Sequence, residues 1–151
     1  MIFHMNAITL LKEDHVLLRK LLETGEDTTE RAVKTRPALL ERITSELQAH
    51  EKIEEDIFYP ALMEHPKAKD IVLEGYQEHH VADILVKELH DMKVTDERWG
   101  AKFKVLKEGI EHHIEEEEGP MFKAARSVFE QVELQDLGEQ MNLLKRKLLR
   151  S

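Results

Sequence analysis

Apolar residues recur every three to four positions along most of this chain, which is the period of an amphipathic α-helix. No stretch shows the strict alternation of apolar and polar residues that is typical of a β-strand. The pattern therefore predicts an all-α protein with four long helices and a short fifth one. We expect these helices at about residues 7–24, 35–64, 66–93, 95–118 and 133–150.

Capping and helix-breaking residues support these boundaries. Asn6 is a typical N-cap for the first helix, Gly25 is a typical stop after it, and Pro37 suits the first turn of the second helix. Pro120 removes a hydrogen bond to the carbonyl of Glu116, so it should kink the fourth helix or end it. Long helices with short connections favour an antiparallel up-and-down four-helix bundle. We expect one domain over residues 1–151, with its core at about 7–126 and the last helix packed across the bundle.

Composition narrows the function classes. The chain has 151 residues, a formal net charge of -9 and no cysteine. The acidic balance argues against a general affinity for nucleic acid or anionic membranes. Without cysteine, disulfides and thiolate metal sites are excluded, and any metal must be held by imidazole and carboxylate. No apolar run approaches the length of a membrane span, so we expect a cytoplasmic protein. We also expect it to be a monomer or a homodimer.

A weak internal repeat is the most informative feature of the sequence. Asp14–His15–Val16 is echoed by His79–His80–Val81, and His50–x-x-x–Glu54 is echoed by His113–x-x-x–Glu117. The order of these elements predicts a duplicated helical hairpin. Residues four apart share one face of a helix, so each His-x-x-x-Glu pair offers a nitrogen and a carboxylate to the core.

The heights of the histidines along the bundle agree with one common layer. His50 and His80 lie about 15 and 14 residues from the turn between their helices, which is roughly 21–23 Å at about 1.5 Å per residue. Placing four imidazoles and two carboxylates in one core layer would be costly without a cation. We therefore predict a metal site at His15, His50, Glu54, His80, His113 and Glu117.

The neighbouring histidines leave a choice on two helices. On the third helix, Leu73, Val81 and Ile84 define an apolar face that includes His80 and directs His79 towards solvent. On the fourth helix, the match to the first repeat favours His113 with Glu117 over the adjacent histidine and glutamate. Each of these positions alone is explained by an ordinary structural role, as a hydrogen-bonded core histidine or as a surface His–Glu pair. Only the presence of all of them in one layer favours a metal site.

In this order and spacing, the motifs resemble those of hemerythrin-like proteins of the HHE cation-binding class, over about residues 7–126. The motif elements are Glu13–Asp14–His15, His50–Glu51–x-x–Glu54–Glu55, Phe58–Tyr59–Pro60, Glu78–His79–His80–Val81 and His113–x-x-x–Glu117–Glu118. The resemblance implies a non-haem site with two Fe ions, bridged by carboxylates and by an oxo or hydroxo group. Mn or Zn would suit such a site less well. The same six residues would be its ligands, and Glu51 is a candidate additional ligand.

One departure from the family bears on function. Oxygen-carrying hemerythrins place two histidines one turn apart on the third helix, whereas this chain has Tyr76 one turn before His80. Tyr76 is therefore a candidate ligand or hydrogen-bond donor, and equally a core aromatic. About two of twelve metal positions would stay open for O2, peroxide or nitric oxide. If the chain is an enzyme, we expect an oxidoreductase acting on one of these. The alternatives are an iron or oxygen sensor, an iron store without turnover, and a structural zinc bundle.

Overall fold

A computed structural model of the chain describes residues 5–150, and this part is helical with no strand. The α-helices are α1 (Ala7–Glu26), α2 (Thr35–Ile53), α3 (Tyr59–Met63), α4 (Lys69–His90), α5 (Trp99–Glu116), α6 (Phe122–Val128) and α7 (Gln131–Arg150). Three short elements connect them: the π-helical turns η1 (Glu54–Phe58) and η3 (Glu117–Met121), and the 3₁₀ turn η2 (Pro66–Ala68). The ends of the predicted domain, residues 1–4 and 151, lie outside the described residues.

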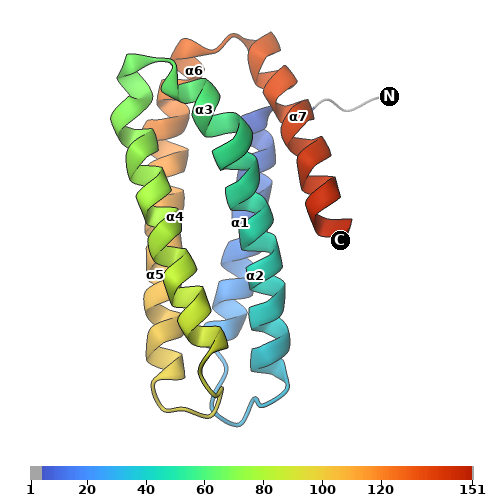
Figure 1. Cartoon of the computed structure of the whole chain (residues 1–151), viewed down its shortest axis with the longest axis vertical. Coiled ribbons are helices and arrows are strands. Elements are labelled where there is room, and N and C mark those ends of the chain that lie inside the picture. The colour runs from blue at the N-terminus through green and yellow to red at the C-terminus, as the bar shows by residue number, and fades with distance from the viewer. Residues whose placement is uncertain (1–4, 151) are drawn as a thin grey trace.

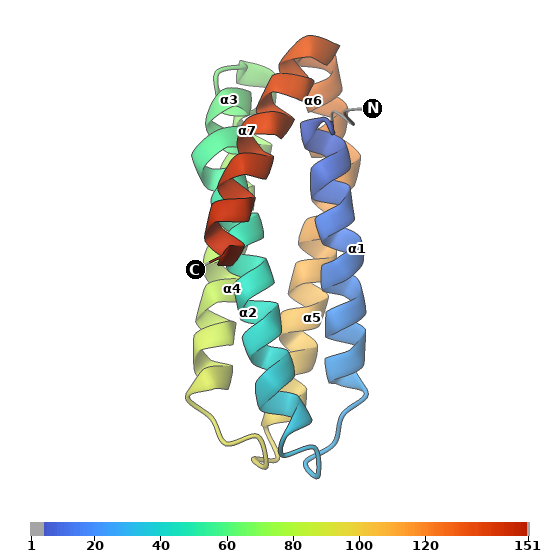
Figure 2. The same cartoon turned by 90° about the vertical axis from the view of Figure 1, so that its right-hand side faces the viewer.

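Four long helical runs stand side by side and alternate in direction (Figure 1). α1 and α4 run one way, and the continuous runs α2–η1–α3 and α5–η3–α6 return the other way. α7 then folds back along the outside and contacts α1 and α2 (Figure 2). The predicted four-helix bundle with a fifth helix is confirmed. The fifth helix is not short, however, because its 20 residues equal those of α1.

The core consists of two apolar clusters separated by a polar layer. On α1, Leu11 belongs to one cluster and Leu18 to the other, and the fully buried His15 lies between them. Each of the other three runs likewise carries a buried histidine between members of the two clusters. The two clusters exclude water from both sides of this layer, so the polar groups within it must satisfy one another or bind a ligand.

The residue type of Gly25 predicts the end of the first helix, but the helix does not end there. α1 continues to Glu26, and Gly25 is itself helical and buried. A Cβ at this position would collide with the ring of Phe103 on α5. The glycine is therefore explained by close helix packing and not by the left-handed backbone of a helix stop.

The fourth run also differs from its prediction at both ends. α5 begins at Trp99 because Asp96 first forms a turn in which its carboxylate accepts a hydrogen bond of 2.8 Å from the Arg98 backbone N–H. Pro120 lies inside η3, and the chain remains helical from Trp99 to Val128. A π-helical turn contains one extra residue and shifts the backbone hydrogen-bond pattern. The chain can therefore stay helical although proline has no N–H to donate.

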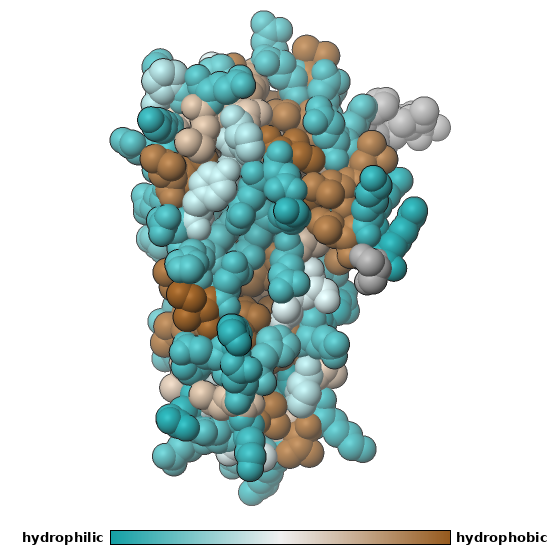
Figure 3. Space-filling model, in the orientation of Figure 1, coloured by the Kyte–Doolittle hydropathy of each residue, from teal (hydrophilic) through white to brown (hydrophobic). Residues whose placement is uncertain are grey.

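The face of the molecule seen in Figure 3 is largely hydrophilic, with several small groups of hydrophobic side chains among the polar ones. Leu73, Val81 and Ile84 of α4 are 43%, 56% and 47% exposed. None of the helices in residues 5–150 combines the length and the apolar character that crossing a membrane requires.

Candidate metal centre

Six side chains from all four long runs meet in the polar layer of the core. They form two overlapping groups, in each of which the nitrogen and oxygen atoms lie within 4.8 Å of one another. One group has two histidines from α1 and α2, the other has two from α4 and α5, and both contain Glu54 and Glu117. The residues are His15 and His50 in one group, His79 and His113 in the other, and the two shared glutamates.

The inner nitrogen of each histidine faces a shared carboxylate. The Nε2 atoms of His15 and His113 lie 3.0 and 3.1 Å from the Glu117 carboxylate. The Nε2 atoms of His79 and His50 lie 3.0 and 3.4 Å from Oε1 of Glu54. Each glutamate is thus positioned between the two histidine pairs and could act as a ligand in both groups.

Both shared glutamates are the first residue of a π-helical turn. Glu54 begins η1 and Glu117 begins η3, each four residues after a core histidine. A π-helical turn inside an α-helix is uncommon and occurs frequently at functional sites. The second half of the bundle thus repeats the first in backbone as well as in sequence, in agreement with the predicted duplication.

The outer nitrogen of each histidine donates a hydrogen bond to a further carboxylate. The Nδ1 atoms of His15, His50, His79 and His113 lie 2.6, 2.9, 2.7 and 2.6 Å from the carboxylates of Glu118, Asp14, Glu55 and Glu78 respectively. A proton held on Nδ1 leaves the Nε2 lone pair free and directed at the centre, which is how metal-binding histidines are oriented.

These outer carboxylates also follow the repeat. Asp14 and Glu78 each precede a core histidine and bond to the histidine of the next helical run. Glu55 and Glu118 each follow a shared glutamate and bond to the histidine on the first helix of the other half, which is His79 on α4 for Glu55 and His15 on α1 for Glu118. The sequence showed these doublets, but their pairing across helices was not predicted.

The prediction of His80 was wrong. His80 is exposed, and His79 is buried at 3% exposure and lies in the centre. The inner face of α4 is formed by Val72, Gly75, His79, Val86 and Leu89. The residues used to orient this helix, Leu73, Val81 and Ile84, instead form an exposed apolar stripe on the opposite side of the helix from this inner face.

Tyr59 is a residue of the centre that sequence reasoning missed. Its fully buried hydroxyl donates a hydrogen bond of 2.8 Å to Oε2 of Glu117 and lies 3.4 Å from Nε2 of both His79 and His113. Gly75 signals this position, because a Cβ there would lie 2.9 Å from the Tyr59 hydroxyl oxygen.

The two candidate additional ligands lie elsewhere. The Tyr76 hydroxyl donates to the backbone carbonyl of Glu55 at 3.3 Å, and its ring packs edge-on against Tyr59. Glu51 is buried but belongs to neither group of the centre. Its side chain lies beside Asp83 of α4 instead. His15, His50, Glu54, His113 and Glu117 are brought together as predicted, whereas Tyr76 and Glu51 are not.

The electrostatics of the centre favour a bound cation. Burial alone would lower the pKa of His113, but the carboxylates of Glu117, Glu54 and Glu78 raise it to about 12. Burial likewise opposes ionisation of Glu117, yet hydrogen bonds with Glu54, His113 and His15 hold its pKa well below the usual range. Oε2 of Glu54 is buried without a hydrogen-bond partner among the described residues. A buried carboxylate oxygen without a partner, on a residue that also contacts imidazole nitrogens, fits the role of a metal ligand.

The fold and this site define a metal-binding helical bundle. In agreement, the family model of the hemerythrin HHE cation binding domain matches residues 6–125. The uncharacterized proteins Rv2633c of Mycobacterium tuberculosis and Mb2666c of Mycobacterium bovis are each 31% identical over 145 residues, covering 91% of this chain and 83% of each relative. The crystal structure of an HHE domain-containing homologue of Rv2633c from Mycobacterium kansasii matches with a TM-score of 0.84 and 28% identity, covering 95% of this chain and 87% of that one. The chain belongs to the hemerythrin HHE cation-binding domain family.

Proposed function

We propose that the chain is a non-haem di-iron protein that binds or turns over a small oxidant, namely O2, peroxide or nitric oxide. The observation that carries this proposal is the pair of two-histidine groups that share Glu54 and Glu117. Imidazole and carboxylate are ligands that iron accepts readily, and two shared carboxylates suit a pair of ions better than one isolated ion. Zinc in structural sites usually takes four ligands of its own in a tetrahedron, which two shared carboxylates match less well.

The ligand count supports reactivity. Two six-coordinate ions need about twelve positions, and four imidazoles with two bridging carboxylates fill about eight of them. Bound iron would supply redox chemistry and positions at which a small molecule can bind. Besides the four outer carboxylates, the hydroxyl of Tyr59 is a further polar group directed at these four imidazoles and two carboxylates.

The space beside the centre limits the size of the ligand. A cavity of about 20 Å³ borders His50, His79 and His113 and is otherwise lined largely by apolar residues such as Leu18 and Ile110. A volume of this size holds about one water molecule. It therefore accommodates a diatomic molecule or peroxide, whereas an organic substrate would require the helices to separate.

The surrounding residues orient and shield the centre. The four outer carboxylates keep the Nδ1 protons in place, so each Nε2 faces inward. The Tyr59 hydroxyl holds one oxygen of Glu117 by a hydrogen bond, and it is also a proton donor within reach of a ligand bound between His79 and His113. The two apolar clusters keep bulk water away from both sides of the layer.

Metal analysis combined with visible spectroscopy tests the proposal. Protein loaded anaerobically with Fe²⁺ should retain two iron ions per chain, and exposure to O2 should produce a charge-transfer band that changes when peroxide or nitric oxide is added. Glu54→Gln should lose both ions, because this glutamate is shared by the two groups. One zinc per chain, no retained iron, or a band that responds to none of these molecules would contradict the proposal.

The cytoplasmic location and the choice between monomer and homodimer stay predictions from the sequence. Size-exclusion chromatography with light scattering measures the second directly.

A further inference from the structure

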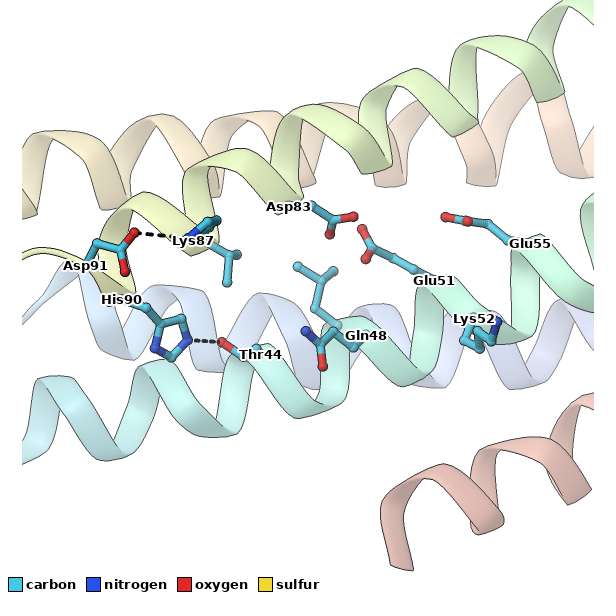
Figure 4. A pocket seen from close by; sticks show the side chains of 11 residues that line it. Thr44, Gln48, Glu51, Lys52, Glu55, Asp83, Lys87, His90 and Asp91 are labelled. Atoms are coloured by element: carbon cyan, nitrogen blue, oxygen red, sulfur yellow. Dashed lines mark hydrogen bonds and ion pairs between the residues drawn. The ribbon is translucent and has the colours of Figure 1, made fainter. Parts of the chain in front are cut away.

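A surface hollow of about 640 Å³ lies between α2 and α4, beside the metal centre (Figure 4). Glu51 lines this hollow, and it also lines the 20 Å³ cavity that borders His50, His79 and His113. Glu51, together with Leu47, therefore lies between the surface hollow and the small cavity beside the centre. Glu55, which bonds to Nδ1 of His79, lies on the wall of the same hollow.

The carboxyl group of Glu51 is buried and incompletely paired. The residue is only 5% exposed, and its Oε2 atom has no hydrogen-bond partner among the described residues. Figure 4 shows this group pointing across the hollow towards the carboxyl group of Asp83 on α4. Two carboxylates that face one another repel when both are ionised, and the cost is greater for the buried one.

The basic residues of the hollow pair with other groups. Lys52 forms an ion pair of 3.2 Å with Asp56, and Lys87 forms one of 3.2 Å with Asp91. The ion pairs described for these two lysines are thus formed with other carboxylates and not with Glu51 or Asp83. A small cation from solvent is the species that would convert the repulsion between the two carboxylates into attraction.

We propose that Glu51 and Asp83 form a separate divalent-cation site, at which a metal ion first binds on its way to the centre. This inference rests on the proposed function, because the ion's destination is the dinuclear centre. Two carboxylates with open space around them suit an oxygen-coordinated ion that keeps several waters. Such an ion is held loosely enough to move on towards the nitrogen ligands behind Glu51.

The count of bound Mn²⁺ tests the site. Metal-free protein is titrated with Mn²⁺ alone, and the free ion is measured by electron paramagnetic resonance. Wild type should bind three ions per chain, and both Glu51→Gln and Asp83→Asn should bind two. Asp91→Asn is the matched control, because it makes the same change from carboxyl to amide in the same hollow but leaves the Glu51–Asp83 pair intact, so it should bind three.

The rate of metal uptake tests the loading role. Anaerobic Fe²⁺ uptake, followed in a stopped-flow instrument by the change in protein fluorescence, should be about tenfold slower in Glu51→Gln and unchanged in Asp91→Asn, since Glu51→Gln removes one of the two carboxyl groups that the incoming cation would meet first. Circular dichroism of the metal-free variants establishes that they are folded.

Each result has a distinct meaning. Two ions in both wild type and Glu51→Gln overturn the site and show that the two carboxyl groups share only a proton, while the dinuclear proposal stands. If wild type binds three ions but Glu51→Gln takes up Fe²⁺ at the wild-type rate, the loading role is overturned. Wild type that binds no ion at the centre overturns the proposed function itself.

Discussion

Nε2 of His79 lies 3.0 Å from Oε1 of Glu54, whereas the adjacent His80 is rotated by about 100° around α4 and is exposed. His79→Ala should therefore remove a metal ligand, and His80→Ala should not. We expect His79→Ala to weaken metal binding by more than the roughly 10–100-fold that loss of an outer hydrogen-bond partner causes. Metal content after dialysis against a weak chelator measures this, and equal losses in the two variants would contradict the assignment.

Asp14 connects the metal centre to the last helix. Its carboxylate accepts a hydrogen bond of 2.9 Å from Nδ1 of His50 and pairs with Lys145 of α7. Asp14→Asn should lower metal affinity about 10–100-fold, because the orientation of His50 is no longer fixed. Glu13→Gln is the control, since it changes an exposed carboxylate on the same helix and should leave affinity unchanged. Competition with a chromophoric chelator provides the affinities.

Tyr59 and Tyr76 are in ring contact but hold different partners. Tyr59→Phe removes a buried hydrogen bond to Glu117 and should destabilise the metal-free protein by about 1 kcal/mol. Tyr76→Phe removes a longer, half-buried bond to a backbone carbonyl and should cost less. Urea unfolding at one pH compares them. In the iron-loaded protein, Tyr59→Phe should alter the visible band and Tyr76→Phe should not. A band that is unchanged in Tyr59→Phe would contradict a role of the Tyr59 hydroxyl at the metal centre.

Gly138 allows α7 to pack against the start of the chain. A Cβ at this position would collide with the backbone carbonyl of Met5. Gly138→Ala should therefore destabilise the protein by about 1–3 kcal/mol through displacement of the backbone. Gly109→Ala is the matched comparison, because a Cβ there meets no atom within 4 Å in the interior of α5. It should stabilise the helix by about 0.5–1 kcal/mol, and thermal unfolding should show shifts of opposite sign.

Glu51 should make the metal-free protein less stable as pH rises. Burial, followed by the contact with Asp83, raises the pKa of Glu51 from 4.5 to about 10. A group with a raised pKa in the folded state contributes stability that is fully present below pH 4.5 and is lost progressively between pH 4.5 and about 10. Glu51→Gln removes this dependence and should be more stable than wild type by about 4 kcal/mol near pH 7.5, at about 1.4 kcal/mol for each of the three pH units above 4.5. Urea unfolding of both proteins at several pH values measures the difference, which should vanish near pH 4.5; a difference independent of pH would contradict the assignment.

The sequence by itself determined the local part of this structure. Helical periodicity located the long helices, and the four-residue spacing placed His50 with Glu54 and His113 with Glu117 on common faces. These relationships depend only on the geometry of one helix, so they survive any arrangement of the bundle. The repeated order of the motifs also indicated the duplication that the two π-helical turns now show in the backbone.

Tertiary structure decided what depends on contacts between helices. The rotation of α4 about its own axis selects His79 over His80, and that rotation follows from packing of Gly75 and Val72 against the first half of the bundle. The apolar residues of the outer stripe gave a competing and wrong orientation, because an exposed apolar side chain costs a protein little. The hydrogen bond from Tyr59 to Glu117 joins residues 58 positions apart, and each outer carboxylate likewise bonds to a histidine on another helix. Periodicity within one helix carries no information about such pairs, because they exist only after the four helices have met.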